Sequence, residues 1–224
     1  MIVTIESRTR VRNDRIAAEN RARLNEARVC AVNLLGAPDA GKTSLLESTI
    51  ETLRADVRVA VVAGDTRSAF DARRLSQLGV PVVQVLLHGE CHLDAALVER
   101  ALDQFEDAGL LAGPAGLELL LIENVDQLHC MPGVDLGEQL RVVMLSASAG
   151  DEALLGCQEA VRSSSALIIN KTDLVPFAHC DLEAMHRLAL QGNPGLAVFE
   201  TSCTTRQGVS EWCAWLARHV ARRG

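Results

Sequence analysis

The sequence is poor in aromatic residues and contains no apolar run long enough to span a membrane. Aromatic residues make up 3% of the 224 residues, so we expect an aliphatic core. A transmembrane helix needs about 20 mainly apolar residues in succession, and no segment approaches that length. The N-terminal stretch MIVTIESRTR also lacks the apolar region of a secretory signal. We therefore expect a globular protein of the cytoplasm without a membrane partner.

The sequence also lacks paired cysteines and an excess of positive charge. The cysteines are seven, an odd number, and no two of them form a CxxC pair. This argues against a disulfide framework and favours reduced thiols in the cytoplasm. The net charge of -7 argues against non-specific binding of nucleic acid or of an anionic membrane. Glutamates interrupt the basic run 8–28, which is predicted to be a solvated helix face.

Short apolar runs alternate with longer helix-period segments along most of the chain. The runs predict strands at 29–35, 57–63, 80–87, 117–125, 141–146, 166–170 and 196–200. The intervening segments predict helices, for example at 43–53, 71–78, 93–107, 182–190 and 209–222. Apolar strands separated by helices are typical of a doubly wound α/β fold, with a mostly parallel sheet covered on both faces.

A polar helix is predicted ahead of the first strand, at 13–28, with Asn13 or Asp14 as its N-cap. We therefore divide the chain into an N-terminal helical arm, 1–28, and a single nucleotide-binding domain with an embedded metal site, 29–224. A chain of this length can bury a sizeable core without disulfides.

Residues 36–43, GAPDAGKT, match the phosphate-binding pattern G-x-x-x-x-G-K-[ST] between a predicted strand and a predicted helix. Backbone N–H groups of such a loop and of the helix N-terminus bind phosphate oxygens. Lys42 would reach the β- and γ-phosphates, and the Thr43 hydroxyl would ligate Mg²⁺. A chance glycine-rich turn is disfavoured because context and spacing agree. The predicted phosphate-binding residues are Gly36, Gly41, Lys42, Thr43 and Ser44.

Asn170-Lys171-Thr172-Asp173 follows a later predicted strand and matches the N-K-x-D pattern that reads guanine in GTPases. The Asp173 carboxylate can accept hydrogen bonds from the ring N–H and the exocyclic amine of guanine, a pair that adenine lacks. Only two lysines occur in the chain, Lys42 and Lys171, one in each motif. Alone, N-K-x-D is a weak signal, but behind a phosphate loop it predicts GTP. The predicted base-binding residues are Asn170, Lys171 and Asp173, with Ser202 and Cys203 in a loop after the last strand.

A cysteine–histidine pair and a third cysteine follow two neighbouring predicted strands. Cys91-His92 comes after the third strand and Cys130 after the fourth, so all three belong to the edge of the sheet that carries the phosphate loop. Thiolate and imidazole suit Zn²⁺ or Ni²⁺, and three ligands leave one position open for exchange. His88 and His129 flank these positions. Taken alone, buried structural cysteines are the commoner interpretation.

Together these motifs resemble the HypB family of GTPases, which help to load nickel into [NiFe]-hydrogenase. The resemblance covers nearly the whole chain. Urease and cobalamin metallochaperones share the two nucleotide motifs but not the pairing of C-H-L-D-A with I-E-N-V. The matching segments include 13–21, 33–35, 64–65, 71–74, 81–84, 91–95, 122–125 with Cys130, 135–138 and 170–174.

The resemblance implies a P-loop NTPase fold of the SIMIBI type and places a metal site at a dimer interface beside the nucleotide switches. Its ligands would be Cys91, His92 and Cys130. The family also implies a homodimer that depends on nucleotide or metal. Its partners would be hydrogenase-maturation proteins and the hydrogenase large subunit. In the family, residues at the positions of Asp65 and Glu123 lie near Mg²⁺ and the γ-phosphate. The implied catalytic residues are Lys42, Asp65 and Glu123, and the implied magnesium ligands are Thr43 and Asp65.

Two aspartates depart from the family pattern. Asp39 replaces a glycine of the phosphate loop, and Asp126 replaces a switch glycine after I-E-N-V. Carboxylates near a polyphosphate repel it, and a β-carbon restricts loop conformations that glycine allows. We therefore expect weakened GTP binding and slow hydrolysis by an attacking water, for which Asp65 and Asp71 are the candidate bases. The alternatives are a non-hydrolysing metal-binding scaffold and, disfavoured by N-K-x-D and by the lack of a lid segment, a metabolite kinase.

Overall fold

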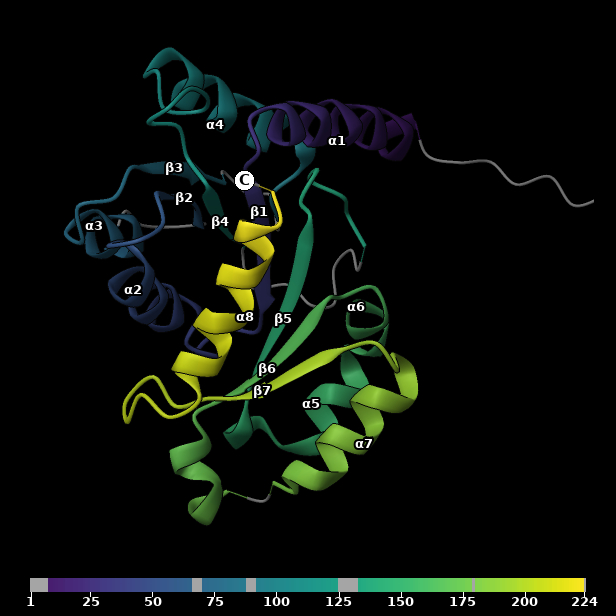
Figure 1. Ribbon diagram of the computed structural model, residues 1–224. Helices are drawn as coiled ribbons and strands as arrows, with labels where there is room; N and C mark the ends of the chain where they lie inside the picture. The colour runs from purple at the N-terminus through teal and green to yellow at the C-terminus, as the bar shows by residue number, and fades with distance from the viewer. Residues whose placement is uncertain (1–7, 66–69, 88–91, 125–132, 179, 224) are drawn as a thin grey trace, which may run out of the picture.

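The protein is built around one parallel β-sheet. The computed structural model describes residues 8–65, 70–87, 92–124, 133–178 and 180–223. Within these ranges seven strands pair in the order β3-β2-β4-β1-β5-β6-β7 (Figure 1). Every pairing between adjacent strands is parallel. The strands are β1 Cys30–Gly36, β2 Val59–Asp65, β3 Val82–Leu86, β4 Leu119–Glu123, β5 Leu140–Ser146, β6 Ala166–Asn170 and β7 Ala197–Glu200.

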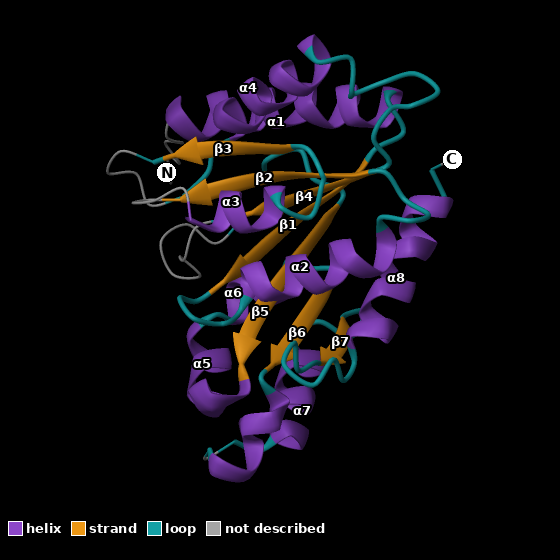
Figure 2. Cartoon of the chain, turned by 90° about the vertical axis from the view of Figure 1, so that its left-hand side faces the viewer, coloured by secondary structure: helices purple, strands orange, loops and turns teal. Residues whose placement is uncertain are grey.

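Helices cover both faces of the sheet, which confirms the predicted doubly wound α/β class (Figure 2). Side chains of α2, α3 and α8 share one apolar core with the sheet. On the opposite face α1 and α4 pack over one half of the sheet, and α5, α6 and α7 pack over the other. The helices are α1 Arg8–Glu26, α2 Lys42–Leu53, α3 Phe70–Ser76, α4 Ala95–Asp107, α5 Gly150–Gly156, α6 Gln158–Arg162, α7 Leu182–Gly192 and α8 Val209–Ala221, with 3-10 helices η1 Ala147–Ala149 and η2 Thr172–Phe177.

The core is aliphatic, as the composition predicts. Among the described residues, Phe105 and Trp212 are the buried aromatic side chains of the core, and the rest of its large side chains are Leu, Ile, Val and Met. Within the described ranges no helix is both long and apolar enough to cross a membrane.

The predicted strands are confirmed in order, and each lies within two residues of its observed ends. The helices between β5 and β6 were not predicted. The chain there forms two short helices, α5 and α6, which meet at Cys157, where φ is -120° and helical geometry is interrupted. Such short pieces carry too few turns for a helical period to stand out in the sequence.

The prediction that Asn13 or Asp14 caps the first helix is wrong. Helix α1 is already helical at Arg8, which places both residues inside it. The Asn13 side chain instead bridges two other segments, donating to the Asp135 carbonyl at 2.8 Å and accepting from the Ala95 N–H at 2.9 Å. Asn13 therefore forms a tertiary contact and not a helix cap, although asparagine is a common capping residue. The local sequence pattern does not reveal this contact.

The basic run in α1 is more than the solvated face that its charge pattern predicts. Arg21 Nη2 donates to both carboxylate oxygens of Asp135, at 2.6 and 2.7 Å. Arg23 contacts Asp103 and Glu106 of α4. Helix α1 therefore packs along α4, as Figure 1 shows. The division of the chain at residue 28 stays a prediction.

Candidate nucleotide and metal sites

The phosphate-binding loop lies at the carboxyl end of β1, in the middle of the sheet. Gly41 caps the N-terminus of α2 with φ 96°, a left-handed conformation that favours glycine. The Lys42 side chain is 8% exposed, and its Nζ donates to the carbonyls of Gly36 and Ala37 at 3.1 and 3.2 Å. The ammonium group is thus folded back over the loop that would bind phosphate.

Thr43 and Glu123, which were predicted to share a site, are in contact. The Thr43 hydroxyl donates to Glu123 Oε1 at 2.7 Å. Glu123 ends β4 and is paired in register with Leu34 of the neighbouring β1, which explains its proximity to the loop. A hydroxyl and a carboxylate form an oxygen donor set of the kind that Mg²⁺ prefers. Asp65 ends β2 on the other side of β4, but its side chain lies outside the described part of the structure.

Asn170 joins the phosphate loop to the base-binding loops. Its Nδ2 donates to the Ala40 carbonyl at 2.8 Å, and its Oδ1 accepts from the Thr201 hydroxyl at 3.0 Å. A β-carbon on Gly41 would lie 2.5 Å from Asn170 Nδ2, so only glycine fits under this amide. Asn170, the first residue of the N-K-x-D motif, therefore connects the phosphate loop to the loop that follows β7.

Among the other predicted base-binding residues, Asp173 has a buried carboxylate oxygen. Lys171 has φ 61°, and the next residue, Thr172, donates twice to the Thr201 carbonyl. Asp173 follows in the first turn of η2. Its Oδ1 is buried and accepts no hydrogen bond from any residue that the structure describes. An oxygen in this state is costly unless a ligand supplies an N–H group, so the position fits a donor such as guanine.

The loop after β7 completes this side of the site. Ser202 is fully buried, and its backbone N–H donates to the Gln207 carbonyl at 3.0 Å. Cys203 is half-buried, with its thiol 3.5 Å from Asn170 Oδ1. Burial raises the pKa of the Cys203 thiol to about 11, so this sulfur is neutral near pH 7. It lines the site as a thiol and not as a reactive thiolate.

Most of the predicted metal site lies outside the described residues. This holds for Cys91 and Cys130, for the flanking His88 and His129, and for Asp126. His92 is described and half-buried, directly ahead of the Leu93-Asp94 turn that begins α4. Within the described ranges no three His, Cys, Asp or Glu side chains gather to hold a metal. The triad Cys91, His92 and Cys130 therefore stays a prediction.

A buried polar network behind the phosphate loop was missed by the sequence reasoning. The Asn124 amide donates to Asn33 Oδ1, and the Asn33 amide donates to Glu138 Oε1, both at 3.3 Å. Arg141 donates to the same Glu138 oxygen at 2.6 and 2.9 Å. The available signal was Asn33 itself, a polar residue in the middle of the otherwise apolar strand β1.

Comparison with known proteins places this site in a family. Residues 30–200 match the family model described as CobW/HypB/UreG, nucleotide-binding domain. The hydrogenase maturation factor HypB of Azotobacter chroococcum mcd 1 is 40% identical over 222 residues, which cover 99% of this chain and 70% of the relative. The chain belongs to the HypB family.

Two solved HypB structures share the fold over nearly the whole chain. HypB from Archaeoglobus fulgidus is 35% identical with a TM-score of 0.85, and the match covers 94% of this chain and 99% of that one. HypB from Helicobacter pylori, solved in complex with nickel, is 28% identical with a TM-score of 0.87, over 94% and 96% of the two chains. The HypB resemblance read from the motifs is thereby confirmed, and with it a nucleotide-binding domain of the P-loop type.

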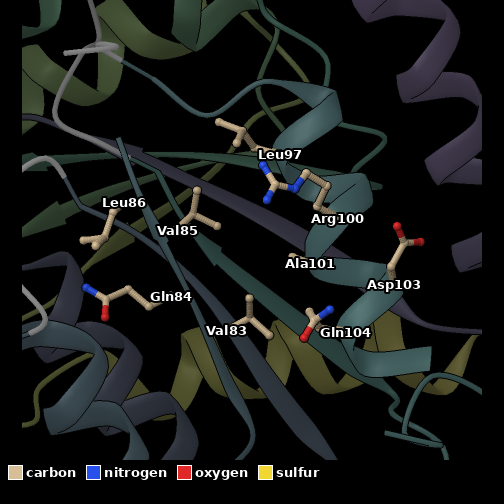
Figure 3. Close-up of a pocket in the computed structure, with 9 residues that line it drawn as sticks. All are labelled: Val83, Gln84, Val85, Leu86, Leu97, Arg100, Ala101, Asp103 and Gln104. Carbon is tan, nitrogen blue, oxygen red and sulfur yellow. The ribbon is translucent and has the colours of Figure 1, made fainter. Parts of the chain in front are cut away.

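A separate hollow of about 360 Å³ lies at the β3 edge of this HypB-family sheet, beside α4 (Figure 3). Val83 and Val85 of β3 and Leu97 of α4 give it apolar walls, and Arg100 lies over it. No residue of the phosphate loop or of the base-binding loops lines it, so it is not the nucleotide site.

Proposed function

We propose that this protein is a GTP-binding metallochaperone that hydrolyses GTP slowly and delivers nickel for the maturation of [NiFe]-hydrogenase. The observation that supports guanine most directly is the buried Asp173 Oδ1, which has no donor among the described residues. Asn170, three residues before Asp173, is bonded to Ala40 of the phosphate loop. One ligand with guanine at one end and phosphates at the other would satisfy both halves of the site.

The phosphate half is arranged for charge stabilisation. Lys42 would contact the β- and γ-phosphates, and the loop N–H groups would bind the remaining oxygens. Thr43 and Asp65 would hold Mg²⁺, which when bound neutralises charge on the phosphates. Glu123 would orient the Thr43 hydroxyl, to which it is hydrogen-bonded at 2.7 Å. Asp65 and Asp71 remain the candidate bases for the attacking water.

The metal half would carry nickel as cargo on Cys91, His92 and Cys130. The nickel complex of the Helicobacter pylori relative supports nickel over zinc. We further propose a homodimer that depends on nucleotide or metal and works in the cytoplasm with hydrogenase-maturation proteins and the hydrogenase large subunit. The shared HypB family supports these partners.

A non-hydrolysing scaffold is the second candidate function, and one residue of the phosphate loop favours it. Asp39 is exposed and has φ 58°, so a carboxylate on a left-handed backbone stands where the family has glycine. Single-turnover hydrolysis of bound GTP separates the two candidates. Product formation with excess protein supports the GTPase, and bound GTP that stays intact for hours supports the scaffold.

The guanine site is tested by Asp173→Asn. The carboxylate accepts from two N–H groups of guanine, whereas an asparagine amide can donate to the oxygen that xanthine carries in place of the amine. We expect GTP affinity to fall at least about 100-fold and XTP affinity to rise, measured by titration with Mg²⁺. Asp181→Asn is the matched control, because Asp181 caps α7 and asparagine caps equally well. An unchanged preference for GTP over XTP would reject the assignment.

A further inference from the structure

A short chain of hydrogen bonds joins the phosphate loop to the segment that carries His92. Thr43 of the loop donates to Glu123 at the end of β4. The next residue, Asn124, accepts a hydrogen bond from the Leu93 N–H at 3.1 Å through Oδ1. Leu93 directly follows His92. The path from Thr43 of the phosphate loop to the predicted metal ligand His92 therefore consists of two hydrogen bonds, Thr43–Glu123 and Leu93–Asn124, and the two peptide links Glu123–Asn124 and His92–Leu93.

The orientation of the Asn124 amide is fixed. Asn124 is 4% exposed, and its Nδ2 donates to Asn33, which leaves Oδ1 facing Leu93. Asn33 is held in turn by Glu138, whose charge is paired with the 11%-exposed Arg141 side chain. If the Asn124 amide were flipped, its NH₂ group would face the Leu93 N–H, and two donors would oppose each other. Buried networks of this kind hold one arrangement because every alternative leaves polar groups unpaired.

The Leu93 side chain packs at the carboxyl ends of β2 and β4. It is fully buried, and a β-carbon on Gly64 would lie 3.1 Å from two of its atoms. The same β-carbon would lie 3.2 Å from the Glu123 carbonyl oxygen. Gly64 precedes Asp65 at the end of β2. Leu93 thus packs where the strands that carry the two candidate carboxylates end, and a displacement of either strand end reaches it.

We propose that Asn124 is a positioning residue that couples the occupancy of the phosphate loop to the geometry at His92. The inference rests on the proposed function, because it needs both a nucleotide and a metal. In the arrangement described here the Thr43 hydroxyl is held by Glu123. When the Thr43 oxygen ligates Mg²⁺, its hydroxyl and the Glu123 carboxylate that accepts from it move together toward the bound phosphates. The adjoining Asn124 shifts with Glu123, and its bond to Leu93 passes the shift to His92. The segment with Glu123, Asn124 and Leu93 then has one position when the phosphate loop is empty and another when it is occupied. Binding at either site shifts the equilibrium between these two positions.

The coupling is measured as the ratio of Ni²⁺ affinities of the full chain with GDP and with a non-hydrolysable GTP analogue. We expect a ratio of about tenfold in the unmodified protein, within the usual range of such couplings. In Asn124→Ala we expect the ratio to fall to within about twofold of one, with Ni²⁺ still bound in both states. A merely structural role would weaken Ni²⁺ binding in both states and leave the ratio intact.

Asn20→Ala is the matched control. Asn20 is also a buried asparagine, and it donates to the carbonyls of Ala95 at 2.8 Å and Leu136 at 3.0 Å. It therefore holds the same start of α4, and none of its hydrogen bonds within the described residues goes to Glu123 or Asn124. We expect this variant to lose stability but to keep the tenfold ratio, which separates loosening of α4 from loss of the link.

Amide hydrogen exchange tests the link without any substitution. The Leu93 amide should exchange at least about threefold differently between the two nucleotide states, because its acceptor is Asn124. The Leu97 amide, bonded to the Asp94 cap of α4 at 2.8 Å, should be unaffected. This comparison remains decisive if Asn124→Ala fails to fold.

The outcomes separate this inference from the proposed function. A tenfold ratio that survives in Asn124→Ala, or equal exchange at Leu93 in both states, overturns the role of Asn124 alone. Failure of the unmodified protein to bind Ni²⁺ overturns the metallochaperone proposal as well. A ratio of one in the unmodified protein overturns the coupling itself.

Discussion

Asp39 is the residue whose backbone explains most about the expected activity. It lies in the phosphate loop with φ 58°, a left-handed conformation that costs a non-glycine residue about 1 kcal/mol. The sequence predicted a conflict between a β-carbon and the loop, and this positive φ gives the conflict a physical basis. The carboxylate adds a charge beside the site proposed for a polyphosphate.

Replacing Asp39 by glycine should strengthen GTP binding. We expect Asp39→Gly to raise GTP affinity about tenfold, with a further gain when Asp126→Gly is added, since one repelled charge is worth ~1.4 kcal/mol near a surface site. Asp39→Asn is the control, because it removes the charge and keeps the side chain on a left-handed backbone. Equal affinities for all these variants in Mg²⁺ titrations would contradict this account.

Sequence reasoning assigned the candidate residues of the nucleotide site but could not give their contacts. Lys42, Thr43 and Asp173 were assigned from motif spacing, because phosphate and guanine demand those groups at those places. Asn170 was assigned to the nucleotide, whereas its amide spans Ala40 and Thr201. Such a contact joins residues 130 positions apart, and no local pattern encodes it.

At the scale of elements, helix α1 is the part of the fold that its sequence describes least well. Its residues Asn13, Asn20 and Arg21 form hydrogen bonds with α4 and with the loop around Asp135. The positions of the strands along the chain and the helix-covered faces of the sheet followed from apolar periodicity, because burial imposes it. A docking contact of α1 depends on a partner segment more than 100 residues away, so periodicity could not predict it.

Gly137 makes the docking of α1 possible. A β-carbon there would lie 2.6 Å from Asn20 Cβ and 2.7 Å from the Ala17 carbonyl oxygen, and φ is +94°. We expect Gly137→Ala to lower the free energy of unfolding by roughly 3 kcal/mol, through both overpacking and backbone strain. Gly79→Ala shares the positive φ, at +77°, but meets nothing within 4 Å, and should cost only about 1 kcal/mol. Equal losses in urea unfolding would show that the contact with α1 is unimportant.

The Arg21–Asp135 pair should make the docking of α1 depend on pH. Burial acts to raise the pKa of Asp135, but hydrogen bonds from Arg21 and from the Gly137 N–H outweigh it, and the pKa lies below its ordinary value. A lowered folded-state pKa contributes stability above the unfolded value, about pH 4, and that stability is lost as pH falls through the folded value.

A double-mutant cycle measures this pair. With more than a third of the Arg21 side chain exposed, we expect a coupling of ~1 kcal/mol at pH 7 that fades below about pH 4. The exposed pair Arg15–Glu19, at 3.5 Å within α1, is the comparison and should give a coupling near zero. A coupling for Arg21–Asp135 that stays constant down to pH 2 would contradict the assignment.

At the scale of the whole molecule, the parallel sheet gives a reason to expect the two proposed sites at one edge. The phosphate loop, Glu123, the His92 segment and the N-K-x-D motif all follow the carboxyl ends of strands, where ligands of open α/β sheets bind. The order of these segments in the sequence therefore predicts that they lie close together. The hydrogen bond between Leu93 and Asn124 connects the end of β4 to the segment that carries His92.

If the proposed function holds, the binding of nucleotide and the binding of metal are coupled, and one titration measures this coupling. GDP and GTP affinities are measured with Mg²⁺, with and without one equivalent of Ni²⁺, for the unmodified protein and for Cys91→Ala. We predict that Ni²⁺ changes nucleotide affinity at least about fivefold in the unmodified protein and not in Cys91→Ala. Absence of nucleotide binding at millimolar concentrations, or an equal effect of Ni²⁺ on both proteins, would contradict the account.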